Sequence, residues 1–191
     1  MKTELRAAMR AIRKAHVAAI GGNSLLLGSA LINRLNALIL QSKITAAYSA
    51  TPTECDVMTA LEALPLDHGR LCLPCASCLA EPLTFRRWHP GEVLQKSALG
   101  FWQPCDTEEI VTPDLFLTPL LAFDRALNRL GQGAGHYDRA FAAHPTALRI
   151  GIAWACQEID AVPTDPWDLS LDAVITENEW ICPPDSRIGQ F

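Results

Sequence analysis

Residues 129–139 read RLGQGAGHYDR, a stretch in which three glycines stand at alternate positions between charged side chains. Glycine permits positive φ and a close approach of the backbone, so consecutive N–H groups can turn toward a single anion. The helix that we expect to begin near His136 would add the positive end of its dipole. This pattern predicts a phosphate-binding loop.

The residues around this loop have the chemistry that a nucleotide triphosphate requires. Arg129 and Arg139 offer charge-assisted hydrogen bonds to phosphate oxygens, and Asp138 offers the hard oxygen ligands that Mg²⁺ prefers. The loop is neither a P-loop nor a dinucleotide-binding fingerprint, because no Lys-Ser or Lys-Thr pair follows it and its glycines are spaced G-x-G-x-G. A glycine-rich turn with an Asp-Arg surface pair on the next helix remains an alternative on spacing alone.

Short apolar segments that alternate with helical patterns must position this loop. Such alternation favours a mostly parallel sheet with helices on both faces, which is a three-layer α/β/α fold. Ligands of these sheets bind beyond the carboxyl ends of the strands, where Thr118 and Pro119 are expected to lead toward the loop. The predicted strands are residues 44–49, 70–74, 83–88, 114–118, 148–153 and 173–176.

A predicted helix near the N-terminus carries two stripes. One stripe is apolar and follows helical spacing until Gly21 and Gly22 end the pattern. The other is basic, and it is either a solvated face or a face whose first residues meet phosphate. The apolar stripe comprises Leu5, Ala8, Met9 and Ile12, and the basic stripe comprises Lys2, Arg6, Arg10 and Arg13.

Three further helices are predicted. Asn23 or Ser24 can cap a helix that runs to about Ile39, and the other two span residues 55–64 and 136–143. The buried stripe of the first of these helices comprises Leu27, Leu31, Leu35 and Leu38.

Composition limits the classes of function. The chain has 191 residues, a hydrophobic content of 49% and a formal net charge of −5. One core, and therefore a single domain over residues 1–191, is expected. The charge gives no general attraction to nucleic acid, no apolar run approaches the roughly 20 residues that span a bilayer, and no secretory signal is recognisable. We expect a cytoplasmic monomer without nucleic-acid or membrane partners.

Cys72, Cys75 and Cys78 have the C-x2-C-x2-C spacing that opens a bacterial ferredoxin motif. The further Cys and Pro of that motif are absent, and Cys72 falls within a predicted strand. Buried or incidental thiols are therefore favoured over a metal or cluster site.

Residues 119–139, PLLAFDRALNRLGQGAGHYDR, resemble the signature of the 5-formyltetrahydrofolate cyclo-ligase family, also called methenyltetrahydrofolate synthetases. In that family a Pro, a short apolar run and Phe-Asp lead to Arg-Leu-Gly, a glycine cluster and Tyr-Asp-Arg. The resemblance implies a NagB/RpiA/CoA-transferase-like fold and an ATP- and Mg²⁺-dependent ligase. Its reaction would convert 5-formyltetrahydrofolate to 5,10-methenyltetrahydrofolate through a phosphorylated formyl oxygen, releasing ADP and phosphate.

The same resemblance implies roles for residues along much of the chain. Lys2 and Arg6 match an N-terminal Lys-x-x-x-Arg that the family uses on ATP, and Asp172 matches a late aspartate that joins Asp138 at Mg²⁺. The implied ATP-binding residues are Lys2, Arg6, Arg129, Leu130, Gly131, Gln132, Gly133, Ala134, Gly135, His136 and Tyr137, with Arg129 and Arg139 catalytic. The implied folate-binding residues are Arg6, Glu54, Trp88 and Tyr137.

Two positions depart from the family pattern. Ala134 replaces a residue that is usually Gly or Lys, and it would strain the loop if this position required positive φ. His136 stands where Tyr or Phe is common, and it is either a stacking or hydrogen-bonding group or a satisfied histidine at a helix start. Two alternative functions stay open: a non-catalytic nucleotide- or folate-binding module on the same scaffold, and an ATP-dependent enzyme acting on another heterocycle.

Overall fold

The computed structural model describes residues 1–191 except 63, 65–67, 80, 184–187 and 189–191. The strands of its central sheet are β1 (Thr45–Ala46), β2 (Leu71–Cys75), β3 (Thr84–Arg87), β6 (Leu115–Pro119), β9 (Leu148–Ile152), β10 (Ala173–Ile175) and β11 (Trp180–Ile181). Their order is β11-β10-β9-β6-β1-β2-β3. Neighbours from β10 to β2 run parallel, and the edge strands β11 and β3 are antiparallel to theirs. The predicted mostly parallel sheet is confirmed.

The central strands are buried on both sides, which explains their continuous apolar runs in the sequence. In β6, Leu115 and Leu117 join the core on one face of the sheet, and Phe116 joins the core on the other. Packing is tight enough to require a glycine in β9, since a Cβ on Gly151 would lie 2.7 Å from a methyl carbon of Leu171.

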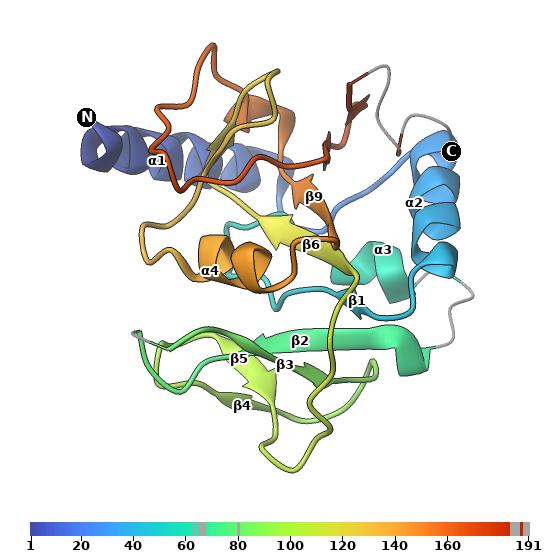
Figure 1. Ribbon diagram of the computed structural model, residues 1–191. Coiled ribbons are helices and arrows are strands. Elements are labelled where there is room, and N and C mark those ends of the chain that lie inside the picture. The colour runs from blue at the N-terminus through green and yellow to red at the C-terminus, as the bar shows by residue number, and fades with distance from the viewer. Residues whose placement is uncertain (63, 65–67, 80, 184–187, 189–191) are drawn as a thin grey trace.

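Helices cover both faces of this sheet (Figure 1). On one face, Leu35 and Leu61 pack into the core that contains Leu115. On the other, the rings of Phe141 and Phe116 meet edge to face with centroids 5.5 Å apart. The helices of the described residues are α1 (Lys2–Ile20), α2 (Ser29–Gln41), α3 (Met58–Glu62) and α4 (His136–Ala143), with short 3-10 helices η1 (His68–Arg70) and η2 (Ala155–Gln157). With α2 and α3 on one side and α4 on the other, the three-layer α/β/α arrangement is confirmed.

Helix α1 packs beyond the carboxyl end of β6, where Met9 contacts Leu121 and Leu130. The predicted apolar stripe is wrong for two of its members, because Ala8 and Ile12 are exposed. Their places on the inner face are taken by the basic stripe. The reason is that α1 covers the charged wall of a cavity in addition to a patch of core.

Two predicted helix starts are wrong. Helix α2 begins at Ser29 and not beside Asn23 or Ser24, because residues before it are extended and Ser24 forms a parallel bridge with Asp56. Helix α3 begins at Met58, whose N–H donates to Asp56 Oδ1. The first error arises from polar residues that can cap a helix but here serve loop contacts. Helix α4, by contrast, has the predicted bounds.

Two short hairpins lie outside the sheet and were missed in the sequence. The hairpin of β4 (Leu94–Lys96) and β5 (Trp102–Pro104) lies beside β2 and β3 at the bottom of Figure 1. The other pairs β7 (Ala122–Phe123) with β8 (Arg129–Leu130), and it connects the carboxyl end of β6 to the glycine loop. Strands of two or three residues are too short for a periodic pattern.

The cysteine trio is divided between core and surface. Cys72 and Cys75 are buried in β2, and Cys78 is exposed. Burial raises the pKa of the Cys75 thiol to about 11. Over the ranges that the structure describes, no three His, Cys, Asp or Glu side chains are grouped so as to hold a metal ion.

None of the described helices combines the length and the apolar character that are needed to cross a bilayer.

Candidate active site

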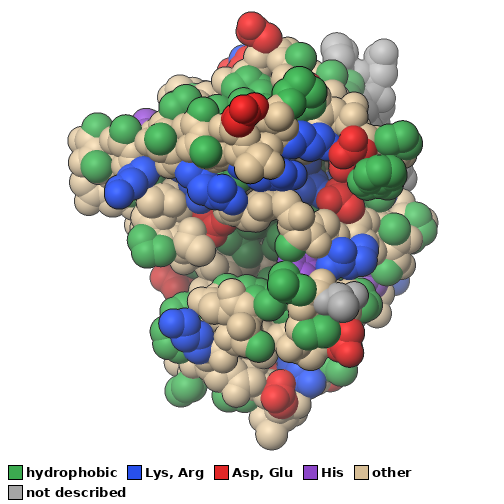
Figure 2. All heavy atoms as spheres, turned by 90° about the vertical axis from the view of Figure 1, so that its left-hand side faces the viewer, with side chains coloured by type: hydrophobic (Ala, Val, Ile, Leu, Met, Phe, Trp, Pro, Cys, Tyr) green, Lys and Arg blue, Asp and Glu red, His purple; other side chains and the backbone are tan. Residues whose placement is uncertain are grey.

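A cavity of about 1140 Å³ opens where α1 and the glycine loop meet the carboxyl end of β6. Figure 2 shows this hollow, with lysine and arginine side chains along its upper edge and hydrophobic side chains inside and below it. The predicted site residues that line it are Lys2, Arg6, Glu54, Arg129, Leu130, Gly131, Gln132, Gly133, Ala134, Gly135, His136, Tyr137, Asp138 and Arg139.

The basic stripe of α1 runs along this cavity and contacts a different part of the wall at each turn. Lys2 Nζ donates to Asp165 Oδ2 at 2.6 Å and to Asp168 Oδ2 at 2.7 Å. One turn later, Arg6 Nε donates to the carbonyl oxygen of Gly131 at 3.0 Å. The stripe is therefore not a solvated face along its whole length.

The second half of the stripe is divided between surface and interior, because Arg10 is exposed and Arg13 is buried. Arg10 Nη2 donates to Gln132 Oε1 at 3.0 Å, and the buried Arg13 donates through Nη1 to the carbonyl oxygen of Leu120 at 3.2 Å. Burial lowers the pKa of Arg13, and the nearby carboxylate of Glu54 opposes that effect.

The alternating glycines allow three guanidinium groups to lie against the loop backbone. A Cβ at Gly131, Gly133 or Gly135 would lie 3.2, 3.3 or 3.2 Å from a guanidinium atom of Arg129, Arg6 or Arg139, respectively. Gly133 and Gly135 also have φ values of 108° and 66°, which other residues rarely adopt. Ala134 is not among the residues with positive φ, so the strain considered for it does not arise.

Arg129 is a buried cation held in place by Asp138. Its Nη2 donates to Asp138 Oδ1 at 2.5 Å, and its guanidinium carbon lies 4.9 Å from the ring centroid of Phe141. Burial lowers the pKa of Arg129, and the Asp138 carboxylate opposes that effect. The Nε–H of Arg129 is buried without a partner among the described residues. Arg129 also lines the cavity, where a fixed guanidinium is suited to an anionic ligand.

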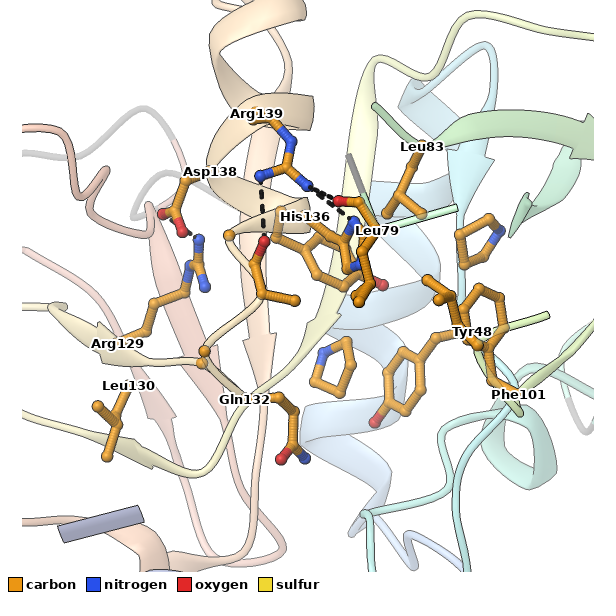
Figure 3. Close-up of a pocket in the computed structure, with 18 of the residues that line it drawn as sticks. Tyr48, Leu79, Leu83, Phe101, Arg129, Leu130, Gln132, His136, Asp138 and Arg139 are labelled. Carbon is orange, nitrogen blue, oxygen red and sulfur yellow. Dashed lines mark hydrogen bonds and ion pairs between the residues drawn. The ribbon is translucent and has the colours of Figure 1, made fainter. Parts of the chain in front are cut away.

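Arg139 and His136 interact at the start of α4, as Figure 3 shows. Arg139 donates to the carbonyl oxygens of Ala134 at 3.0 Å and Leu79 at 3.1 Å, and its Nη2 lies 3.0 Å from His136 Nδ1. Burial lowers the pKa of His136, and the charge of Arg139 lowers it further. His136 therefore accepts from Arg139 through a neutral ring, which fits the interpretation of a satisfied histidine at a helix start.

Glu54 is 7% exposed and faces the cavity from the segment after β1. Its Oε2 accepts the N–H of Thr51 at 2.9 Å, and its Oε1 accepts Gln132 Nε2 at 3.3 Å. Arg13 Nη1 lies 3.8 Å from Oε1. These contacts fix the direction of the carboxylate and link it to the glycine loop.

Opposite the cations stands an apolar wall, which we define as Tyr48, Leu79, Leu83, Leu99 and Phe101. In Figure 3, Tyr48, Leu83 and Phe101 lie across the cavity from Arg129 and Asp138. The segment after β2 is held against β5 by the N–H of Ala76, which donates to Gln103 Oε1 at 3.0 Å. Sequence reasoning missed this wall, since isolated apolar residues in loops carry no pattern that distinguishes a ligand contact from a core contact.

Two predicted site residues lie elsewhere. Trp88 is 6% exposed and packs in the core with Leu71. The backbone N–H of Trp88 donates to the carbonyl oxygen of Leu71 at 3.1 Å. Asp172 precedes β10 at the amino ends of the strands, where its Oδ2 accepts the N–H of Arg149 at 2.8 Å. Neither lines the cavity, so the geometry does not support their expected contacts with folate and Mg²⁺. Asp165 and Asp168, which sequence reasoning missed, are the further aspartates on the cavity wall.

A comparison with protein families agrees with this geometry. The model described as the 5-formyltetrahydrofolate cyclo-ligase family matches residues 1–177. The chain belongs to this family. The matched range contains α1, the glycine loop, Glu54, and the Asp165 and Asp168 side chains that bind Lys2. The resemblance predicted from the sequence is therefore confirmed, and the chain is placed in a family of ligases.

Curated cyclo-ligases resemble the chain over most of its length. The 5-formyltetrahydrofolate cyclo-ligase of Haemophilus influenzae is 30% identical over 69% of this chain and 74% of its own. The enzyme of that name from Escherichia coli is 31% identical over 74% of this chain and 84% of its own.

Solved structures of cyclo-ligase family members share the fold. The 5,10-methenyltetrahydrofolate synthetase of Aquifex aeolicus superposes with a TM-score of 0.70 at 25% identity, covering 97% of this chain and 94% of that one. The synthetase of Mycoplasma pneumoniae superposes with a TM-score of 0.62 at 23% identity, covering 92% of this chain and 98% of that one. The second likeness supports the fold alone.

Proposed function

We propose that this cavity binds ATP and 5-formyltetrahydrofolate and produces 5,10-methenyltetrahydrofolate, ADP and phosphate. The observation that carries the proposal is the convergence of the glycine loop, Arg6 and Arg129 on the same cavity that Glu54 faces. The names of the cyclo-ligases that resemble the chain supply the substrate.

The difficulty of the reaction is electronic, because the oxygen of a formamide is a poor leaving group. In the proposed first step, this formyl oxygen attacks the γ-phosphorus of ATP, and the bond from that phosphorus to the bridging oxygen breaks to release ADP. In the second step, N10 attacks the formyl carbon and gives up its proton to solvent, and the carbon–oxygen bond breaks as phosphate leaves, which forms the methenyl bridge. Phosphoryl transfer of this type requires mainly positioning and charge neutralisation from the protein.

The cationic wall, which we define as Lys2, Arg6, Arg129 and the backbone of residues 131–135, would hold the triphosphate. Arg129 lines the cavity, and its guanidinium is fixed by Asp138 Oδ1 at 2.5 Å. A fixed donor that needs no reorganisation stabilises developing charge better than a mobile one. Arg139 would act beside it by holding the carbonyl oxygen of Ala134 and thereby the shape of the loop.

The acidic residues of the cavity fit a magnesium ion. Mg²⁺ in nucleotide sites takes one or two carboxylates together with phosphate oxygens and water. Asp138 faces the cavity and would be the protein ligand, with Asp165 or Asp168 on the cavity wall in place of the expected second aspartate. When bound, the ion would neutralise charge on the phosphates.

Glu54 would bind the pterin through its amino and ring N–H groups, since a carboxylate accepts two parallel hydrogen bonds. The apolar wall would contact the faces of the ring system. Tyr137 also lines the cavity, and burial raises the pKa of its hydroxyl, which therefore remains a donor.

The test is to mix purified protein with Mg-ATP and 5-formyltetrahydrofolate and to follow the methenyl product by its near-ultraviolet absorbance. We expect product only when ATP is present, with one ADP formed per product. No ATP-dependent product at any substrate concentration would contradict the proposal.

The two alternatives give other outcomes in the same assay. A binding module would show thermal stabilisation by ATP and folate without turnover. An enzyme for another heterocycle would give no product from 5-formyltetrahydrofolate. A different pterin would stabilise it in a thermal-shift panel, and it would consume ATP in the presence of that pterin.

A further inference from the structure

Trp167 is 69% exposed although it lines the cavity. Trp88 and Trp154 are buried, as is usual for a side chain whose burial is so favourable. Trp167 therefore leaves most of its indole surface available at the edge of the cavity.

The turn that carries Trp167 is rigidly built. The N–H of Asp168 donates to the carbonyl oxygen of Asp165 at 2.9 Å, and the N–H of Asp165 donates back to Asp168 Oδ2 at 2.8 Å. Pro166 takes the second position of this turn, where its fixed φ is preferred. Both carboxylates also bind Lys2, so the turn that carries Trp167 is held at a fixed place relative to α1.

The contacts of α1 show which groups follow one another along the cavity. Lys2 binds the turn of Trp167, Arg6 binds Gly131, and Arg13 lies beside Glu54. At about 1.5 Å per residue, Lys2 and Arg13 are roughly 17 Å apart along the helix axis. That length is comparable to an extended nucleoside triphosphate whose terminal phosphate points toward Glu54.

This order leaves one place for the nucleobase. The γ-phosphate must face the formyl group, and Glu54 marks the pterin end, so the opposite end of the nucleotide must point toward Lys2. The flat group that arrives at Trp167 is therefore the base.

We propose that Trp167 stacks on the nucleobase of the bound nucleotide and so determines that the phosphoryl donor is a nucleoside triphosphate and not a bare polyphosphate. The assignment depends on the proposed function in one respect. It assumes that the cavity binds a nucleotide and that Glu54 lies at the pterin end, away from the nucleobase. Stacking tolerates any base, because every base has a π-face, and we expect ATP and GTP to be bound with similar affinity at this contact.

The experiment compares Trp167→Ala, Trp167→Phe and wild-type protein by titration calorimetry with Mg-ATP, magnesium tripolyphosphate and 5-formyltetrahydrofolate. The matched control is Trp102→Ala, which removes an indole that is 51% exposed on β5 and outside the cavity. We expect Trp167→Ala to bind Mg-ATP about tenfold more weakly, with the affinities for tripolyphosphate and folate unchanged. Trp167→Phe should retain most of the affinity, and Trp102→Ala all of it.

Several outcomes would overturn the assignment. Unchanged ATP affinity in Trp167→Ala would show that the indole does not stack on the base. An equal loss of affinity for tripolyphosphate would show that the turn acts through Lys2 instead. A loss for 5-formyltetrahydrofolate alone would place the aromatic ring of the folate at Trp167. Wild-type protein that binds no nucleotide would overturn both this assignment and the proposed function, whereas full turnover with unchanged ATP affinity in Trp167→Ala would overturn the assignment alone.

Discussion

The two sides of the cavity are organised on different physical grounds. On the cationic wall each charge already has a partner: Lys2 binds Asp168, Arg6 binds a loop carbonyl, and Arg129 binds Asp138. On the apolar wall, Leu83 and Phe101 contribute shape and surface without directed contacts.

This difference indicates a division of labour. Fixed charges in a partly desolvated site act strongly on charge that develops during a reaction, and they lose little by reorganisation. Apolar contacts scale with the area that they bury and do not distinguish the ground state from the transition state. We therefore expect the cationic wall to govern kcat and the apolar wall to govern the KM for folate.

The strongest test of this division is Arg129→Ala. We expect kcat to fall about 1000-fold, because a fixed donor to the transferred phosphoryl group is lost. The melting temperature should also fall, since Asp138 loses its ion pair. The control is Arg125→Ala, which removes an exposed arginine paired with Glu158 and Glu179 outside the cavity, and steady-state kinetics should find it unchanged. A loss confined to KM would place Arg129 outside the rate-determining chemistry.

The second largest effect on kcat is expected for Asp138, the ion-pair partner of Arg129. In Asp138→Asn we expect kcat to fall roughly 100-fold through the loss of a magnesium ligand, with partial recovery in excess Mg²⁺. A magnesium titration of the rate measures both effects, and the exposed Asp160→Asn provides the control. Wild-type activity and magnesium dependence in the variant would remove Asp138 from the metal site.

A smaller effect is expected at the pterin end. Glu54→Gln should raise the KM for 5-formyltetrahydrofolate about 30-fold, because hydrogen bonds to a charged acceptor are replaced by weaker ones. The KM for ATP should stay nearly constant when both constants are determined by initial rates. A defect in ATP alone would contradict the assignment of Glu54 to the pterin.

The apolar wall is tested by Phe101→Ala. Here we expect the KM for folate to rise about fivefold from lost contact area, with kcat within a factor of two. Val93→Ala, which truncates an exposed residue of the same hairpin region, should change neither constant. A fall in kcat larger than that in Asp138→Asn would break the comparison between the two walls.

The smallest effect is the pH dependence of stability. Burial and, for His136, the charge of Arg139 hold the pKa values of His136 and His144 below 6.5 in the folded state. The unfolded chain then binds more protons below about pH 6.5, so stability should fall as the pH decreases through that region. Thermal melts between pH 7.5 and 5.5 should show a shallower slope in His136→Phe than in wild type. An identical slope would mean that His136 does not charge on unfolding.

Much of the fold could be predicted from the sequence because the patterns that indicate it are local. The strand near residue 115 is a continuous apolar run, and α4 begins directly after glycines and has the bounds that were predicted. Predictions failed where a local signal served another purpose. Ser24 can cap a helix but pairs with Asp56, and Ile12 fits an apolar stripe but points to solvent.

The candidate site divides in the same way. The residues of the glycine loop are contiguous, so their chemistry and spacing were visible together, and all of them line the cavity. Trp88 and Asp172 were assigned by type and approximate position, and the fold places one in the core and the other at the amino ends of the strands.

By itself, the sequence determined the parallel α/β sheet, the glycine loop and the cyclo-ligase family, since each depends on neighbouring residues whose backbone preferences and chemistry act together. Only the tertiary structure decided which face of α1 turns inward, which apolar residues form the wall opposite Arg129, and that Asp165 and Asp168 hold Lys2. Those contacts join residues as much as 166 positions apart, and their energies depend on burial and on the approach of distant atoms. A linear pattern of residue types contains neither quantity.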